Sequence, residues 1–228
     1  MANDFERILL FSGGIDSFVA WHYLNKPQTL YFDIDSRYSL KERTVVSNLI
    51  PGTIIDESMC LGDREVGEKA YIPFRNLFFA LQATKYSDNI YIAGLADDMV
   101  SDKNEEIFDQ WSAMMTQMEE RPIKVMSPFW GMTKSEVVTW YRDYVGNVQP
   151  LLGTTSCYNP TEHYCGKCPS CFRKWSAFME NGIKLEFHNI LLMQEYVKKA
   201  EQGFYHPKRC KEIITSVQTY MKDSLRKA

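Results

Sequence analysis

Two groups of side chains in this sequence have the types and the spacing that chemistry requires. The first is a six-residue string at residues 12–17, which holds two serines, two adjacent glycines and an aspartate. Glycines permit a tight turn and let an anion approach the backbone, and serine hydroxyls donate hydrogen bonds to it. The second group is a set of four cysteines within fifteen positions: Cys157, Cys165, Cys168 and Cys171.

The elements around residues 12–17 favour an anion site. Residues 8–11 form an apolar run that predicts a buried strand, and residues 18–24 predict a helix. The loop therefore leads to the unpaired N–H groups and the positive dipole end of a helix. It is not a Walker A loop, because no G-x-x-x-x-G-K-[ST] string occurs. The Ser-Gly-Gly-x-Asp-Ser string resembles the PP-loop of ATP pyrophosphatases; the alternative is a plain turn capped by the aspartate or a serine.

The cysteine spacing predicts a metal site with four sulfur ligands. A Cys-x2-Cys pair lets two sulfurs reach one ion, and four thiolates suit tetrahedral Zn²⁺. All four positions are filled by protein, so we expect the zinc to be structural. The alternatives are a redox pair of Cys165 and Cys168, a ligand from His163, and an iron–sulfur cluster. We expect Cys60 and Cys210 to be ordinary reduced thiols.

Composition indicates a packed globular protein of cytoplasmic type. The chain has 228 residues, of which 45% are hydrophobic and 14% aromatic, which suits one large α/β domain with a small appendage. With 26 basic and 29 acidic residues, a broad nucleic-acid-binding surface is not expected. There is no signal-peptide pattern and no run of about 18 apolar residues that would cross a membrane.

Apolar strands alternate with amphipathic helices, which predicts a parallel twisted sheet flanked by helices, an α/β fold. Further strands are expected at residues 29–34, 53–56, 90–93 and 123–126. Helices are expected at residues 40–50, 74–86, 107–118, 133–144, 172–180, 190–202 and 207–226. The fourth of these helices begins with a capping box, Thr133 to Glu136. We expect a nucleotide-binding domain at residues 1–148 and a zinc-binding helical portion at residues 149–228.

Several motifs, in this order, resemble the 7-cyano-7-deazaguanine synthase family. They are the Ser-Gly-Gly string, Tyr-Ile-Pro-Phe-Arg-Asn at 71–76, Thr-Thr-Ser-Cys-Tyr at 154–158 and the cysteine block that continues to residue 178. The resemblance spans residues 7 to 182, and it implies a PP-loop fold of the adenine nucleotide alpha hydrolase type. It also implies an ATP-dependent ligase that converts 7-carboxy-7-deazaguanine and ammonia into 7-cyano-7-deazaguanine, on the route to queuosine and related bases, with ATP, Mg²⁺ and Zn²⁺.

That reaction explains the need for ATP. A carboxylate is a poor electrophile, and a mixed anhydride with a phosphoryl or adenylyl group supplies a leaving group. Ammonia can then form an amide, whose oxygen must also be activated before the nitrile forms. A site that stabilises phosphates and aligns both reactants does most of this work.

The resemblance implies an ATP site around the loop. Its residues are Phe11, Ser12, Gly13, Gly14, Ile15, Asp16, Ser17 and Arg37. The serines and glycines are expected to hold phosphates. Asp16 is expected to bind Mg²⁺ or to cap the helix. Arg37 follows the second expected strand, at the edge where such sheets bind ligands.

Catalysis is expected to involve Asp16, Arg75 and Lys134. The fork of Arg75 suits a phosphate or a carboxylate, with a surface salt bridge as the alternative. Lys134 opposes the dipole at a helix start, which leaves a phosphate contact and a solvated side chain as equal alternatives. Asn76 is expected to bind substrate or cap a helix, and Asp102 and Glu106 to bind the deazapurine.

The sequence departs from the family pattern at the segment expected to line the deazapurine pocket. Residues 100–107 keep only the two carboxylates of the family string. A second enzyme interpretation therefore keeps adenylation and changes the acceptor to another carboxylate, a protein or a tRNA base. A non-catalytic zinc-bearing binding module is the alternative from another class. The oligomeric state stays open, and a homodimer is compatible with the sequence.

Overall fold

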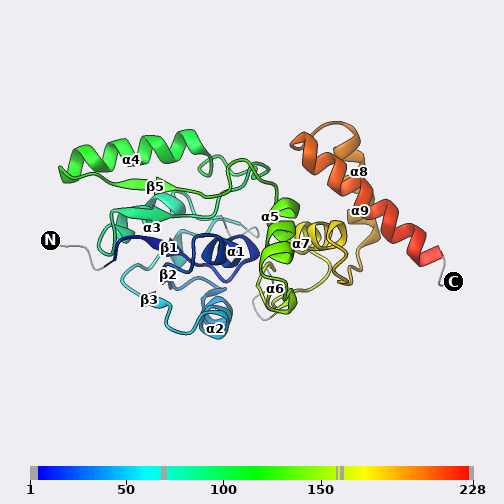
Figure 1. Ribbon diagram of the computed structural model, residues 1–228, viewed down its shortest axis with the longest axis horizontal. Coiled ribbons are helices and arrows are strands. Elements are labelled where there is room, and N and C mark those ends of the chain that lie inside the picture. The colour runs from blue at the N-terminus through cyan, green and yellow to red at the C-terminus, as the bar shows by residue number, and fades with distance from the viewer. Residues whose placement is uncertain (1–4, 68–70, 158, 160–161, 226–228) are drawn as a thin grey trace.

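The computed structural model describes residues 5–67, 71–157, 159 and 162–225 (Figure 1). Within them lies a five-stranded sheet in the order β3-β2-β1-β4-β5. The strands are β1 (Ile8–Leu10), β2 (Gln28–Phe32), β3 (Ile54–Asp56), β4 (Asn89–Tyr91) and β5 (Lys124–Met126). Every neighbouring pair is parallel, so the predicted α/β fold with a parallel sheet is confirmed.

Helices connect the strands and continue beyond them. The helices between strands are α1 (Ile15–Tyr23), α2 (Ser39–Leu49), α3 (Arg75–Ala83) and α4 (Glu105–Glu119), with a short 3₁₀ turn η1 (Gly62–Arg64). Those after the sheet are α5 (Lys134–Tyr144), α6 (Gln149–Leu152), α7 (Pro169–Glu180), α8 (Ile190–Glu201) and α9 (Pro207–Leu225).

The strand order creates a crevice beside β1. The chain moves outward from β1 to β2 and β3, and then returns to place β4 on the other side of β1. Leu9 of β1 thus lies between Thr29 of β2 and Tyr91 of β4. Ligands of open parallel sheets bind at such a reversal, beyond the carboxyl ends of the strands. The loop that joins β1 to α1 (residues 12–17, the β1–α1 loop) starts at this end.

Alternate strand residues point to opposite faces of the sheet and build two cores. Leu9 packs in a cluster with side chains of α1, α5 and α7, such as Phe18 and Val138. Ile8 and Leu10 pack on the other face with side chains of α3 and α4, where Phe108 is buried. Both faces are covered (Figure 1), which is why the strands read as continuous apolar runs.

A third cluster joins the cysteines to the C-terminal helices. It contains Cys157, Cys171 and Trp175 together with residues of α8 and α9. Helix α7 contributes to this cluster and, through Phe178, to the core beside the sheet. The division of the chain at residue 148 therefore stays a prediction.

Most expected elements appear within a few residues of their predicted bounds, and two differences have local causes. Helix α1 begins at Ile15 because Gly14 serves as its N-cap. Helix α6 was not expected where Pro150 interrupts the pattern, yet proline is well tolerated in a first helical turn, where it sits here. The capping box of Thr133 and Glu136 is confirmed.

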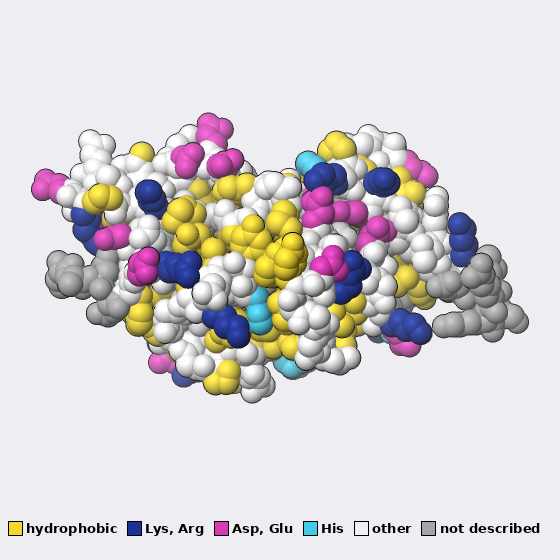
Figure 2. Space-filling model, viewed as in Figure 1, with side chains coloured by type: hydrophobic (Ala, Val, Ile, Leu, Met, Phe, Trp, Pro, Cys, Tyr) yellow, Lys and Arg dark blue, Asp and Glu magenta, His cyan; other side chains and the backbone are white. Residues whose placement is uncertain are grey.

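The molecular surface in Figure 2 mixes acidic and basic side chains over the face in view. Hydrophobic side chains lie between them near the middle of this face. None of the helices described in the structure is long and apolar enough to span a membrane.

Candidate active site

The β1–α1 loop is held in shape by its glycines and its own serines. Gly13 has a φ of 71°, which favours glycine, and a Cβ atom there would lie 3.0 Å from Val45 Cγ1. The N–H of Ser12 donates to Ser17 Oγ at 3.3 Å, and that hydroxyl donates to the Gly14 carbonyl at 3.2 Å. No described side chain caps α1, so the loop offers an open helix N-terminus.

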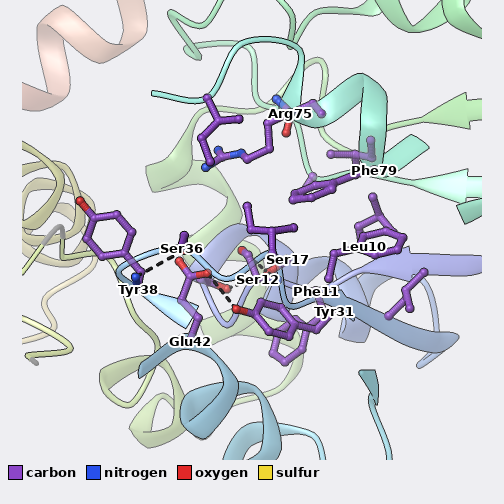
Figure 3. Close-up of a pocket in the computed structure, with 18 of the residues that line it drawn as sticks. Leu10, Phe11, Ser12, Ser17, Tyr31, Ser36, Tyr38, Glu42, Arg75 and Phe79 are labelled. Carbon is purple, nitrogen blue, oxygen red and sulfur yellow. Dashed lines mark hydrogen bonds between the residues drawn. The ribbon is translucent and has the colours of Figure 1, made fainter. Parts of the chain in front are cut away.

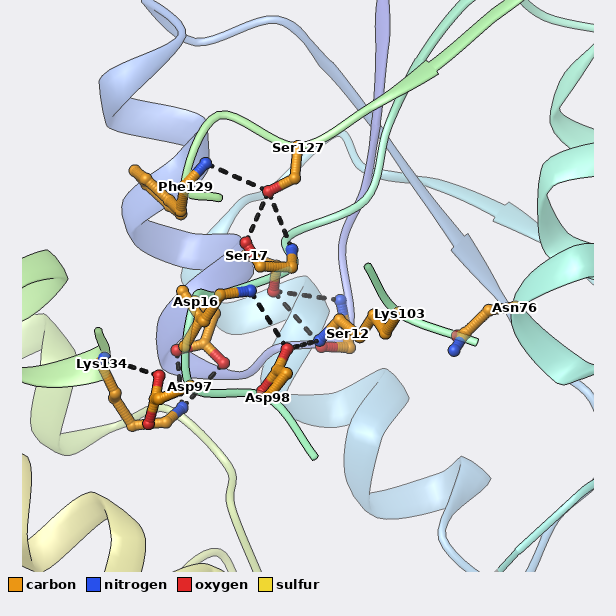
Figure 4. A network of polar contacts seen from close by, with 12 residues as sticks. Ser12, Asp16, Ser17, Asn76, Asp97, Asp98, Lys103, Ser127, Phe129 and Lys134 are labelled. Carbon is orange, nitrogen blue, oxygen red and sulfur yellow. Dashed lines mark hydrogen bonds and ion pairs between the residues drawn. The ribbon is translucent and has the colours of Figure 1, made fainter. Parts of the chain in front are cut away.

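Asp16 pairs with a lysine from a distant helix and does not cap α1. Both of its carboxylate oxygens accept from Lys134 Nζ, at 2.6 and 2.7 Å (Figure 4). Lys134 begins α5, and its side chain is only 13% exposed. Burial lowers the pKa of Lys134, and the charge of Asp16 opposes that shift. The cap proposed for Asp16 and the solvated side chain considered for Lys134 are therefore both wrong.

Helix α7 adds two more cations to this region. Arg173 donates to Asp98 at 2.7 Å and pairs with Asp97 at 3.0 Å. Lys174 Nζ donates to the carbonyl and the hydroxyl of Thr154, at 2.7 and 3.0 Å. Burial lowers the pKa of Lys174 to about 7. Neither cation had a predicted role. Both lie just after Cys171, within the motif that continues to residue 178, and that motif could have pointed to them.

These cations border the polar lobe of a cleft at the crevice beside β1. The polar lobe has a volume of about 290 Å³. Its charged lining residues are Asp16, Glu42, Arg75, Lys134, Arg173 and Lys174. Cations outnumber carboxylates there, so the lobe suits an anionic ligand.

An apolar lobe of about 200 Å³ adjoins the polar one (Figure 3). Its apolar lining includes Leu10, Phe11, Phe32, Ile34, Ile72 and Phe79. Two of these rings, Phe32 and Phe79, stack with centroids 5.1 Å apart. The residues that border both lobes are Ser12, Gly14, Asp16, Tyr38, Glu42 and Arg75. The two lobes are therefore parts of one cleft, which the β1–α1 loop divides.

The structure brings most of the expected ATP residues to this cleft. Phe11 and Ser17 border the apolar lobe, and Ile15 borders the polar one. Gly13 lines neither lobe and acts through the shape of the loop. Arg37 also lies outside both lobes: it forms an ion pair with Glu65, which borders the apolar lobe.

Arg75 points into the border between the two lobes. It is the first residue of α3 and follows Phe74, whose φ is 59°. Among the described residues, Arg75 has no hydrogen bond or ion pair with another side chain, and it is exposed. The surface salt bridge considered as an alternative is therefore not observed. An exposed guanidinium without a partner in a cleft is available to an anionic ligand.

Of the other residues expected to bind substrate, Asn76 and Asp102 contact each other, whereas Glu106 lines neither lobe. Asn76 borders the apolar lobe, and its amide lies 3.2 Å from each oxygen of Asp102. Asn76 does not cap α3, because no side chain caps that helix within the described structure. Asp102 lines neither lobe. Glu106 is exposed in the first turn of α4, where Gln110 donates to it at 3.3 Å.

Glu42 of α2 is a cleft residue that the sequence analysis missed. Its carboxylate points into the cavity, where the hydroxyl of Tyr31 donates to it at 3.3 Å (Figure 3). Acidic residues are common in the first turn of helices because they favour the dipole. That frequency is why the sequence carried no signal for Glu42.

The four cysteines meet in one cluster beside the cleft. Their sulfur atoms all lie within 4.8 Å of one another, and Cys157 and Cys168 are 3.9 Å apart at sulfur. A tetrahedron with Zn–S bonds of about 2.3 Å has sulfurs about 3.8 Å apart. The donor set therefore fits a single zinc ion. The cluster argues against a redox role for Cys165 and Cys168 alone, and no histidine joins it among the described residues.

The cysteine cluster is connected to the β1–α1 loop. The N–H of Thr155 donates to the Gly13 carbonyl at 2.9 Å. Lys41 of α2 donates to the carbonyls of Cys157 and Asn159, at 2.5 and 2.7 Å. The segment before the first cysteine thus forms a wall of the polar lobe. Tyr158 of the family motif lies outside the described residues.

A family model described as queuosine biosynthesis protein QueC matches residues 37–182. The match includes Arg75, Lys134 and all four cysteines, and it begins after the β1–α1 loop. It spans well over half of the chain.

Curated relatives match over most of their length. A protein named 7-cyano-7-deazaguanine synthase from Marinobacter nauticus is 25% identical over 210 residues, with 77% of this chain and 93% of the relative covered. One of the same name from Chlorobium luteolum is 26% identical over 217 residues, 78% of this chain and 94% of the relative. One from Methanothermobacter thermautotrophicus is 29% identical over 140 residues, 58% and 60% of the two chains.

Proposed function

We infer the function from the family to which this chain belongs, that of the queuosine biosynthesis protein QueC. The chain is an ATP-dependent carbon–nitrogen ligase that converts 7-carboxy-7-deazaguanine and ammonia into 7-cyano-7-deazaguanine. The observation that carries this proposal is the single cleft that joins the β1–α1 loop, Arg75 and three cations. The names of the relatives supply the product.

ATP binds with its phosphates in the polar lobe. The N-terminus of α1 and the hydroxyl of Ser12 donate to the phosphates, and Lys134, Arg173 and Lys174 offset their charge. The adenine occupies the apolar lobe, because the walls there are apolar and aromatic and adjoin the loop directly.

Arg75 holds the substrate carboxylate at the border of the lobes. A carboxylate oxygen attacks a phosphorus of ATP there, which gives the phosphoryl or adenylyl mixed anhydride and releases ADP or pyrophosphate, respectively. The cations of the polar lobe stabilise the charge that develops on that leaving group. Ammonia displaces the activated oxygen to give the amide, and activation of the amide oxygen permits its loss as the nitrile forms. Alignment by the fixed loop and by Arg75 supplies much of the rate.

The proposed reaction would use two metal sites. Asp16 is the carboxylate beside the phosphates that would hold Mg²⁺, which prefers oxygen ligands and offsets phosphate charge. Both oxygens of Asp16 accept hydrogen bonds from Lys134, so Lys134 and Mg²⁺ would share this carboxylate. Zinc would be held by Cys157, Cys165, Cys168 and Cys171, where it stabilises the wall of the polar lobe.

The test is a direct assay of the purified protein with ATP, Mg²⁺, ammonium and 7-carboxy-7-deazaguanine, in which mass spectrometry follows the base. We expect the amide and the nitrile to appear only when ATP is present. Turnover of ATP only with another acceptor would keep the adenylating class and overturn the substrate. Failure to bind ATP would favour the binding module.

We also propose a cytoplasmic location and a homodimer. None of the described cysteines forms a disulfide, which suits a reducing compartment. Sedimentation at several protein concentrations would measure the oligomeric state.

A further inference from the structure

Six residues border both lobes of the cleft, and two of them carry carboxylates: Asp16 and Glu42. Asp16 is held at both oxygens by Lys134. Glu42 has no cation within ion-pair distance among the described residues, and its recorded side-chain contact is the Tyr31 hydroxyl at 3.3 Å. It is therefore the carboxylate of the border that remains available to a ligand.

The proposed reaction requires a proton acceptor at the border of the two lobes. Ammonium has no lone pair, so it must lose a proton before it can attack an activated carboxylate. We propose that the carboxylate of Glu42 accepts this proton, which makes Glu42 a catalytic residue of the ligase; the inference rests on the proposed function.

Glu42 takes one proton from NH₄⁺ and becomes neutral, and the lone pair of NH₃ forms a C–N bond to the acyl carbon. The C–O bond to the phosphorus ester breaks, and the leaving group departs with the electron pair. The nitrogen loses its second proton to water, and Glu42 returns its proton to solvent through the open cleft.

The surroundings of Glu42 suit a proton acceptor. Burial raises the pKa of Glu42, and Asp33 raises it further. The charges of Arg75 and Lys41 and the hydroxyl of Tyr31 oppose that rise. Across the polar lobe Glu42 faces Asp16 and the cations Lys134, Arg173 and Lys174. A carboxyl whose pKa lies above its ordinary value is a stronger base than a solvated one.

The position of Glu42 opposite Arg75 in the cleft also suits this role. Arg75 and Glu42 come from α3 and α2 and border the same two lobes (Figure 3). A substrate carboxylate held by Arg75 and activated at the β1–α1 loop has its carbon between these groups. Glu42 and the Tyr31 hydroxyl, which stays protonated because burial raises its pKa, therefore flank the approach of the nucleophile.

The test compares Glu42→Gln with Glu201→Gln, a matched change at an exposed position near the end of α8. With saturating ATP and 7-carboxy-7-deazaguanine, we expect the kcat of Glu42→Gln with ammonium to fall about 100-fold or more. Its KM for both substrates should stay within about twofold of wild type. With hydroxylamine, an amine that is largely uncharged at neutral pH, the loss of kcat in Glu42→Gln should be about tenfold smaller than with ammonium.

The pH profile gives the second readout. Wild-type kcat should fall as pH decreases through the pKa of Glu42, and Glu42→Gln should lack this acidic limb. Glu42→Asp, which keeps a carboxylate, should retain the limb at a lower rate and covers the case in which Glu42→Gln does not fold. An equal deficit with both nucleophiles, or a change in KM alone, would overturn the proposal. Inactive wild-type protein would instead refute the proposed ligase.

Discussion

At the residue scale, the Asp16–Lys134 pair joins the β1–α1 loop to α5 across 118 positions of sequence. A partly buried pair gains little net stability because both charges lose solvation. Because the pair lies at the β1–α1 loop, we infer that its desolvation cost has a functional reason. The lysine places its side chain beside the proposed phosphate site, and the charge of Asp16 opposes the lowering of the Lys134 pKa that burial causes.

Replacement of Lys134 by alanine should damage turnover more than folding. The change removes a phosphate-facing cation and leaves Asp16 unpaired, so we expect kcat/KM for ATP to fall about 100-fold or more. Steady-state kinetics would measure it, with Lys184→Ala as the control because Lys184 is exposed outside the cleft. A loss below about threefold would remove Lys134 from the catalytic set.

At the scale of elements, the β1–α1 loop depends on one backbone conformation. Gly13 combines a positive φ with close contact to Val45 of α2. The Thr155 N–H holds its carbonyl from the other side. The loop is therefore fixed by neighbouring elements before any ligand binds, which lowers the entropy that binding costs.

Gly13→Ala should destabilise the fold by about 1 to 2 kcal/mol, the usual cost of a left-handed conformation in a non-glycine residue. It should also weaken ATP binding, because relief of the strain would move the loop. Urea unfolding and calorimetry would measure the two effects. Gly131→Ala is the matched control, since open space surrounds that position and its φ is not positive. Equal stability of the two variants would contradict this account.

Helices α5 and α9 meet at a contact whose contribution to stability depends on pH. The hydroxyl of Thr133, which caps α5, donates to Glu212 of α9 at 2.5 Å. Burial raises the pKa of Glu212 to about 7, with contributions from Asp97, Glu136 and Glu180. The folded state thus binds this proton more tightly than the unfolded chain, so Glu212 should cost stability as pH rises from about 4.5 to 7.

Glu212→Gln should therefore be more stable than wild type at pH 8, by about 1 kcal/mol after allowance for solvent screening. At pH 4 the advantage should vanish, because the wild-type carboxyl is then protonated in both states. Unfolding midpoints at the two pH values would measure the difference. A larger gain at pH 4 than at pH 8 would show that another group governs this contact.

At the scale of the whole molecule, the cysteine cluster connects the C-terminal helices to the catalytic cleft. It shares a hydrophobic cluster with α7, α8 and α9, and residues next to Cys157 reach the β1–α1 loop through Thr155. Metal binding would therefore set the position of the cleft wall as well as the fold of the cysteine segment.

We expect about one zinc per purified chain, and its removal should affect both stability and ATP binding. A strong chelator should lower the melting temperature by at least about 5 °C. It should also raise the KM for ATP, because Thr155 would no longer hold the loop. Metal analysis and thermal melts would measure this, with added zinc as the control. Two zinc ions per chain, or an iron chromophore, would refute the assignment.

The amino-acid sequence predicted those features of the fold and the site that depend on short stretches of the chain. Apolar runs and periodic patterns located the strands and most helices, because those signals reside in neighbouring residues. The string at residues 12–17 and the cysteine spacing likewise predicted an anion site and a metal site, and the structure brings the four cysteines together. The capping box at Thr133 was local for the same reason.

What the tertiary structure decided is which distant groups meet. It paired Asp16 with Lys134, brought Arg173 to Asp97 and Asp98, and turned Glu42 into the cleft. These partners come from separate helices whose packing no short pattern encodes. The sequence by itself determined the six-residue loop through which we propose that the substrate is activated. The positions of the groups that act on it were decided by the fold, because side-chain partners depend on contacts between segments far apart in the chain.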